Sequence, residues 1–300
     1  MKQFFRKLFW FLGIIVVLNL LYLLLLLGLS PGFKKIHDIS NFENKSFDII
    51  VLGNSMALDG IDAAYLTKNG LPTYNLSVAG DHVSTSLFLL EDYIKKNKRP
   101  KMVVVGLSSA IGKSYLNPVP FTNPEVEFFY HPNFISNFTN PPMLNFQWLA
   151  VDLLKIVLSK DHREATMVLG QWKTKKVIPD GSVYKNTSSK SIDYRDPYLL
   201  GIIALCQTQG IKPVVIELPG SNGNQNDLPL KYTVKLKNGT NQEVHNLNSN
   251  AVASKIINPA TDWLAQDHLN QNGGTKITTY LLDQVLSKEL KASLSNQDKP

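Results

Sequence analysis

The chain has 300 residues, of which 44% are hydrophobic and 18% charged, with a formal net charge of +7. This length and composition predict one large domain, or one domain with an insertion, that can bury a sizeable core. The positive charge is modest, and no stripe of Lys and Arg is interleaved with aromatic residues, so nucleic-acid binding is not expected.

An uncharged apolar segment runs from Leu8 to Leu29. About 20 such residues in a helix are enough to cross a membrane, so residues 1–30 predict one transmembrane anchor. Lys2, Arg6 and Lys7 precede it, which predicts a cytoplasmic N-terminus and an extracytoplasmic remainder. A signal peptide cleaved near Gly28-Leu29-Ser30 is the alternative, but the apolar region exceeds a usual signal core, which favours an anchor.

The segment after the apolar run opens with Pro31-Gly32 and predicts a linker or a first capping segment over residues 31–46. We expect the main domain over residues 47–290 and a polar tail over residues 291–300. The single cysteine, Cys206, lies in an apolar run that predicts a helix, so we expect a buried thiol and no internal disulfide.

Residues 49–52 form a short apolar run that is largely β-branched, which predicts a buried parallel strand. Gly53 permits a sharp exit, so Ser55 is expected at the carboxyl end of the strand, where open α/β sheets bind ligands. A Ser at this place is a candidate nucleophile, and its backbone N–H can help to hold an oxyanion. Alternatively, Asn54 and Ser55 only cap the next helix.

The following segments alternate between helical and strand patterns. A parallel α/β sheet is the architecture that this alternation predicts. We expect helices over residues 61–68 and 84–96, and strands over residues 74–78 and 102–107.

A stretch rich in Pro and aromatic residues, from about 112 to 193, interrupts this rhythm, although residues 148–158 predict a helix. We interpret the stretch as an insertion over the strand ends that borders the mouth of the site, as a lid or a partner surface. A surface excursion without function is the alternative. The sheet pattern then resumes.

The last third predicts a helix over residues 197–209, a strand over residues 212–218 and a final helix over residues 276–290. Asn238-Gly239 lies inside the weakly alternating residues 232–244 and indicates a β-hairpin.

A histidine, His268, stands in a polar loop ahead of Gly273-Gly274 and an amphipathic helix. Such a His can act as a general base; the alternative is a surface His in a helix-capping loop. The other histidines lack metal-ligand spacing, so we predict no metal and no cofactor.

Two short blocks in this order, Gly53-Asn54-Ser55 and His268-Leu269-Asn270 followed by Gly273-Gly274, resemble the SGNH (GDSL-like) hydrolase superfamily. The resemblance covers roughly residues 47–290, with a large unmatched middle part. It implies an α/β three-layer sandwich with a mainly parallel, flavodoxin-like sheet behind the transmembrane helix. It also implies Ser55 as the nucleophile and His268 as the base.

The family completes its oxyanion hole with a Gly after the second strand and an Asn after the third. Gly80 matches the Gly, but Gly106-Leu107-Ser108-Ser109 stands where the family pattern is Gly-x-Asn-Asp. Ser108 is therefore the expected third donor, through a hydroxyl with shorter reach than an amide. Loss of one oxyanion donor typically costs about 10²–10³ in rate.

The family's acid lies three residues before the His, where this chain has Ala265. Asp267 is the nearest carboxylate in sequence, although its adjacency to His268 is a poor geometry for a bond to the ring. Asp262 reaches the ring only if the loop turns back. A displaced acid, a Ser–His dyad and lost catalysis all remain open.

The layout is similar to membrane-anchored SGNH-like proteins that partner membrane-bound O-acyltransferases, such as the D-alanine transfer protein of teichoic-acid operons and the alginate acetylation accessory proteins. This similarity implies an extracytoplasmic esterase or O-acyltransferase that acts on acyl esters of a cell-surface glycan. The alternative is a catalytically inactive binding or scaffold protein that partners a membrane O-acyltransferase.

Overall fold

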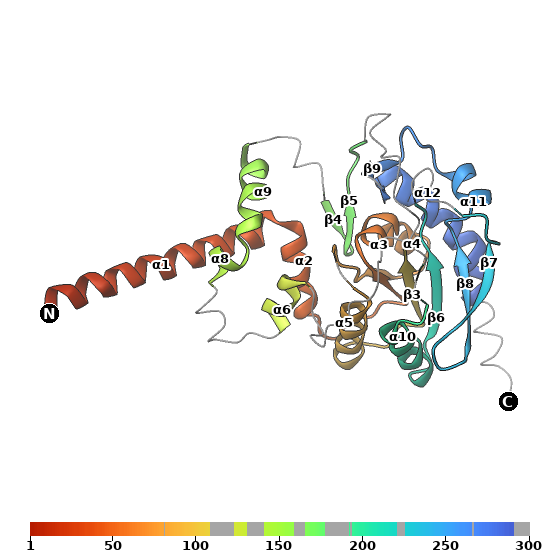
Figure 1. Ribbon diagram of the computed structural model, residues 1–300, viewed down its shortest axis with the longest axis horizontal. Coiled ribbons are helices and arrows are strands. Elements are labelled where there is room, and N and C mark those ends of the chain that lie inside the picture. Colours follow the sequence, from red (N-terminus) through yellow and green to blue (C-terminus); the bar gives the residue numbers. More distant parts are fainter. Residues whose placement is uncertain are drawn as a thin grey trace. The chain divides into compact units, whose positions relative to one another are not determined.

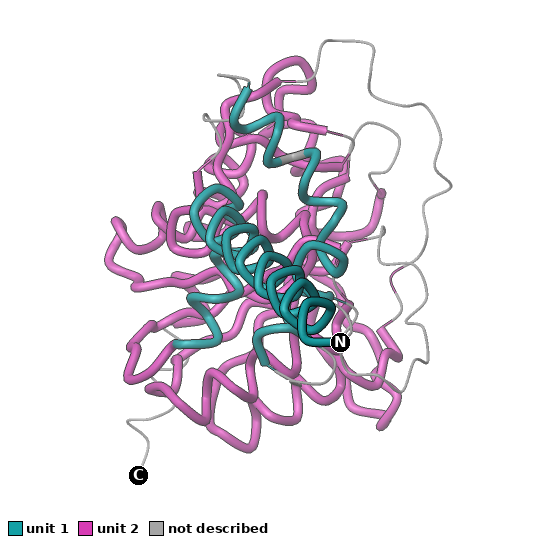
Figure 2. The backbone as a smooth tube through the Cα atoms, turned by 90° about the vertical axis from the view of Figure 1, so that its left-hand side faces the viewer, with its two compact units in different colours: residues 1–41, 123–164 teal, residues 42–122, 165–300 magenta. Residues whose placement is uncertain are grey.

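The computed structural model describes residues 1–80, 82–108, 123–130, 141–158, 166–177, 192, 194–220, 226–265 and 267–290. The predicted tail, the position of Ser109 and both ends of the predicted insertion lie outside the described residues. The chain forms two compact units, one of residues 1–41 with 123–164 and the other of residues 42–122 with 165–300 (Figure 2).

The larger unit is built on a six-stranded, mostly parallel sheet, as the alternating pattern predicts (Figure 1). The strand order is β2-β1-β3-β6-β8-β7. The first five strands run parallel to one another, and the edge strand β7 is antiparallel to β8. The strands are β1 Ile49–Gly53, β2 Thr73–Asn75, β3 Met102–Leu107, β6 Lys212–Glu217, β7 Lys231–Lys235 and β8 Asn241–Asn246.

The central strands are buried on both faces, which explains why they read as continuous apolar runs. One face packs in a single core with α3, α4, α11 and α12; α5 contacts β1, and α10 contacts both α5 and β6. The helices are α3 Ser55–Gly60, α4 Ala63–Lys68, α5 Val83–Lys96, α10 Pro197–Thr208, α11 Asn250–Ile256 and α12 Gln271–Leu281, which continues as a π-helical turn over Leu282–Leu286.

Most of the predicted elements of this unit are confirmed. The hairpin around Asn238-Gly239 is the antiparallel pair β7–β8, with Gly239 at φ +83°, the left-handed conformation that such a turn requires. Cys206 is fully buried, as predicted. Side-chain caps explain several helix starts: Asp196, which precedes Pro197 at the first position of α10, accepts from the backbone N–H groups of Tyr198 and Leu199.

The smaller unit contains the predicted membrane segment as one helix, α1 Lys2–Leu29, which is long and apolar enough to cross a membrane. Residues 31–46, expected as a linker or capping segment, include a second helix, α2 Pro31–Ser40, whose first turn Ser30 caps. Further helices are α6 Pro124–Tyr130, α8 Pro142–Asn145 and α9 Gln147–Leu158. Their core joins Leu26, Phe33, Phe146 and Leu153.

The stretch predicted as one insertion is divided between the two units. Helices α6, α8 and α9 belong to the smaller unit, whereas the antiparallel hairpin β4 Thr166–Val168 and β5 Gln171–Lys173 belongs to the larger one. The hairpin contacts the sheet edge, because the Asn75 N–H donates to the Leu169 carbonyl at 2.9 Å. Only this second part of the insertion can be placed next to the predicted site.

Candidate catalytic site

The helix α3 begins directly after β1 because two glycines make room for it. Gly53 and Gly106 are register partners at the ends of β1 and β3. Gly53 has φ +148°, and a Cβ there would lie 2.6 Å from both the Ala57 Cβ and the Gly106 carbonyl oxygen. Ala57 therefore packs onto bare backbone, and the first turn of α3 is held at the carboxyl ends of the two central strands.

Ser55 is the first residue of α3 and is partly exposed. Its neighbour Asn54 caps the helix: the Asn54 Oδ1 accepts from the Met56 N–H at 3.0 Å. The Asn54 Nδ2 in turn donates to the Ser108 Oγ at 3.3 Å. The capping alternative thus holds for Asn54, while Ser55 starts the helix at the strand edge where ligands bind in open α/β sheets.

The ring of His268 faces α3, where it meets a carboxylate. Its Nδ1 lies 2.8 Å from the Oδ2 of Asp59, and the Asp59 side chain is only 9% exposed. Asp59 follows Ser55 by four residues, so one helical turn places both on the same side of α3. With Nδ1–H donated to Asp59, the Nε2 of His268 carries the lone pair that a general base needs.

The Gly pair after His268 allows α12 to approach the end of α3. A Cβ on Gly274 would lie 2.9 Å from the Asp59 carbonyl oxygen, and a Cβ on Gly273 would lie 2.5 Å from the Asp262 carbonyl oxygen. The start of α12 is capped by Asn270, which accepts from the Gly273 N–H. Short strands β9 Trp263–Ala265 and β10 His268–Leu269 precede it and set His268 against α3.

The hairpin β4–β5 supports α3 from another side. The buried side chain of Gln171 donates through Nε2 to the Asp59 carbonyl at 3.1 Å. Lys173 forms an ion pair with Asp62, the cap of α4, at 2.7 Å, and both side chains are largely buried. Asn75, at the end of β2, donates to the Ala57 carbonyl at 2.8 Å. The segment that carries Ser55 and Asp59 is thus held by hydrogen bonds on several sides.

The carboxylate on the His268 ring differs from the ones that the sequence suggested. The expected acid, Asp267, lies at φ +57° in the turn between β9 and β10, and the carboxylate on Nδ1 is that of Asp59. Asp262 is also not that carboxylate; it accepts from the Lys276 ammonium at 2.6 Å and from the Asn258 N–H at 2.7 Å. The alternative of a Ser–His dyad without a carboxylate likewise leaves out Asp59, which the structure places on the His268 ring.

The four-residue spacing of Ser55 and Asp59 places them on one side of a helix but does not indicate that Asp59 contacts His268. The sequence predicts a helix over residues 61–68, whereas α3 covers Ser55–Gly60, so this shared side was not predicted. The SGNH pattern has its acid near the His, so the resemblance pointed to Asp262 and Asp267 instead.

The predicted oxyanion donors occupy different environments. Gly80 is exposed in the turn after β2, at φ +71°. Ser108 directly follows β3, is fully buried, and its Oγ accepts from Asn54. Ser108 therefore contacts the cap of α3, and its role as a direct oxyanion donor stays a prediction, as does that of Gly80.

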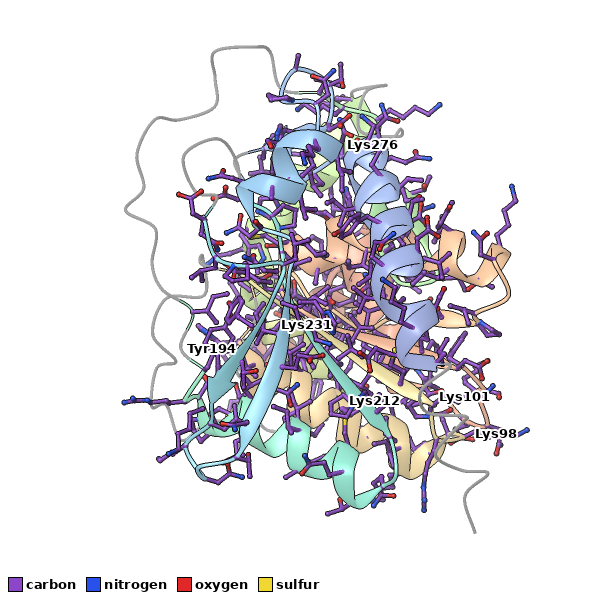
Figure 3. All side chains as sticks on the ribbon, turned by 90° about the vertical axis from the view of Figure 1, so that its right-hand side faces the viewer. Lys98, Lys101, Tyr194, Lys212, Lys231 and Lys276 are labelled. Atoms are coloured by element: carbon purple, nitrogen blue, oxygen red, sulfur yellow. The ribbon has the colours of Figure 1, made fainter. Side chains whose placement is uncertain are left out.

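A buried carboxylate lies at the end of β6, outside the predicted site. Glu217 accepts at Oε1 from Asn226 at 2.8 Å and from Asn248 at 3.0 Å, and at Oε2 from the Tyr232 hydroxyl at 2.8 Å. The Tyr194 hydroxyl, labelled in Figure 3, lies 2.6 Å from that of Tyr232. Burial raises the pKa of both phenols, and their mutual hydrogen bond raises that of Tyr194 further. These contacts compensate the burial of Glu217.

Within the described ranges, one group could hold a metal: Glu243, His245 and Glu289, whose ligand atoms lie within 4.8 Å of one another. Burial lowers the pKa of His245, while the nearby carboxylates of Glu243 and Glu289 act in the opposite direction. Lys231 pairs with Glu243 at 2.7 Å and Lys212 with Glu289 at 2.9 Å (lysines labelled in Figure 3). Each of the two carboxylates is thus paired with an ammonium group.

Comparison of the sequence with known protein families finds no matching family, and comparison with curated proteins finds no matching relative.

Proposed function

We propose that this chain is a membrane-anchored serine esterase or O-acyltransferase of the SGNH type, with a three-layer α/β domain outside the cytoplasm. Its substrates are acyl esters of a cell-surface glycan. The single observation that carries the catalytic part is the 2.8 Å contact between the His268 Nδ1 and the Asp59 carboxylate, one helical turn from Ser55. The long apolar helix α1 supports the anchor.

The proposed reaction uses three residues in the roles of a serine triad. The Ser55 Oγ attacks the acyl carbonyl while the His268 Nε2 takes its proton, and Asp59 stabilises the imidazolium that forms. The backbone N–H groups of Ser55 and Gly80 stabilise the tetrahedral oxyanion. Collapse breaks the bond to the leaving alcohol, which takes the proton from His268 and leaves an acyl group on Ser55.

The second half of the reaction decides between hydrolysis and transfer. Water or a glycan hydroxyl gives its proton to His268 and attacks the acyl-Ser55 carbonyl, and the regenerated Ser55 takes the proton back. Water as acceptor makes the chain an esterase, and a sugar hydroxyl makes it a transferase. A membrane-bound O-acyltransferase is the partner that would supply acyl groups in the second case.

A binding or scaffold role beside a membrane O-acyltransferase is the second candidate. The environment of Ser108 favours it, because the family's Asn is replaced by a fully buried Ser whose oxygen contacts Asn54. A site short of one oxyanion donor loses about 10²–10³ in rate. In this case Ser55 and His268 serve as sugar contacts.

Labelling with a fluorophosphonate separates the two candidates. We expect the full-length protein in detergent to be labelled at Ser55, and we expect Ser55→Ala and His268→Gln to abolish the labelling. Ser254→Ala is the matched control, since Ser254 is an exposed helical serine in α11. If the wild-type protein is neither labelled nor able to hydrolyse any ester, the catalytic proposal is lost and the binding role leads.

A further inference from the structure

The helices α8 and α9 of the smaller unit expose a continuous set of large apolar side chains. A large set of exposed apolar side chains on neighbouring helices is typical of a surface that meets lipid or another protein rather than water. Leu153 points inward to the core of the unit, while Leu154 next to it is 60% exposed and Leu158 is 82% exposed. The exposed members are Met143, Leu144, Trp148, Val151, Leu154, Val157 and Leu158.

These helices are hydrogen-bonded to the predicted transmembrane helix. The Asn19 Oδ1 accepts from the Met143 N–H at 3.0 Å, at the start of α8. The Tyr22 hydroxyl donates to the Phe146 carbonyl, between α8 and α9, at 2.7 Å. The first N–H groups and the last carbonyl groups of a helix lack partners within the helix, and in lipid they must find them in protein. Asn19 supplies such a partner to the Met143 N–H, and Tyr22 adds a second donor to the Phe146 carbonyl, which also accepts from the Leu149 N–H at 2.9 Å.

The contacts on α1 set the depth of these helices. Asn19 precedes Leu29, the last residue of α1, by ten residues, which is about 15 Å at the helical rise. This is half of a hydrocarbon core of about 30 Å. Tyr22 lies about 10 Å from the same end by the same rise. If α1 spans the membrane, Phe146 and the exposed residues beside it therefore lie at the depth of acyl chains.

The direction of α9 fits an in-plane helix. Figure 1 shows α9 rising steeply from the C-terminal half of α1, rather than running beside it. A helix across a membrane-spanning helix lies roughly in the membrane plane. Lys155, the basic residue of its last turn, is exposed and has a side chain long enough to reach the headgroups.

We propose that residues 141–158 are embedded in the lipid leaflet that holds the C-terminal half of α1, with their exposed apolar face on acyl chains. This inference rests on the anchor of the proposed function and is independent of its chemistry. The occupant of the face is lipid, because the same α1 that must lie in lipid supplies the polar contacts of α8 and α9. The segment then fixes the smaller unit to the membrane at a second place.

The test uses single cysteines in the full chain, reconstituted in vesicles of phosphatidylethanolamine and phosphatidylglycerol. The native Cys206 is fully buried, and burial raises the pKa of its thiol to about 12, so it stays unlabelled. Spin labels go on Leu154→Cys in α9, on Leu20→Cys as a lipid control in α1, and on Asn238→Cys as a water control in the β7–β8 turn. Relaxation by oxygen and by a water-soluble nickel complex is then measured.

We expect position 154 to match position 20, with strong relaxation by oxygen and a loss of relaxation by nickel. If position 20 is lipid-exposed but position 154 matches position 238, the embedded segment is refuted while the anchor holds. If positions 20 and 154 both match position 238, the anchor itself is lost, and this inference with it. Shielding of position 154 in native membranes but not in vesicles would mean a protein partner, which also overturns the lipid proposal.

Discussion

The replacement Asp59→Asn tests the one contact on which the catalytic proposal depends. Asn keeps the size of the side chain, so the packing of this buried position is preserved. It removes the charge that lies 2.8 Å from the His268 Nδ1, and its amide can hold the ring in the wrong tautomer. Under the proposed mechanism, the hydroxyl of Ser55 then loses its general base while its position in α3 is kept.

The expected loss follows from the charge that His268 gains in the transition state. Two unit charges about 4 Å apart interact by about 4 kcal/mol at the effective dielectric constant of about 20 that suits such sites. This is about a 10³-fold change in rate. In serine triads the same exchange costs about 10⁴-fold, because the tautomer is lost as well. We therefore expect a loss between about 10³- and 10⁴-fold.

The measurement is the second-order rate constant for fluorophosphonate labelling of Ser55, with the melting temperature recorded to confirm folding. Asp262→Asn is the matched control, because it also removes a buried carboxylate from the loop before His268, but one that is paired with Lys276. Asp262→Asn should lower the melting temperature, but the labelling rate constant of the folded variant should stay within about threefold of the wild-type value. If Asp59→Asn labels as fast as wild type, or if the control loses as much, the triad assignment is refuted.

Three further changes probe the site and its support. Ala265→Asp places a carboxylate where the SGNH pattern has one. Because the Asp59 carboxylate already contacts the His268 ring, the proposed triad predicts a change in labelling rate of less than about twofold, and a large gain would contradict it. Gly53→Ala should lower the free energy of unfolding, measured in urea, by about 1–3 kcal/mol more than Gly70→Ala does. Both glycines have positive φ, but only Gly53 has atoms within 4 Å of a new Cβ. Equal losses for the two variants would refute the close packing at Gly53. Tyr232→Phe leaves one Glu217 oxygen without its hydroxyl donor and should lower the free energy of unfolding by about 1–3 kcal/mol; an unchanged value would mean that water replaces the hydroxyl.

The local patterns of the sequence were sufficient for the strands and for the long apolar N-terminal helix. Apolar β-branched runs predict buried strands because both faces of a parallel sheet are covered. β3 is buried over its whole length and β1 from Ile49 to Leu52. An uncharged run over Leu8–Leu29 predicts a spanning helix from its length alone. These features depend only on neighbours in the chain, so the sequence determines them by itself.

The acid of the site and the fate of the insertion were decided by tertiary structure. Asp59 and His268 are 209 residues apart, and they meet because Gly273 and Gly274 let α12 approach α3 while β9 and β10 turn the ring inward. No spacing rule contains this information, since the contact depends on how two segments pack. The division of the insertion was likewise not predictable from spacing. Its helices α8 and α9 pack with α1 and its helix α6 packs with α2, whereas its hairpin packs on α3. Its apolar residues find different partners in space, and composition alone does not separate them.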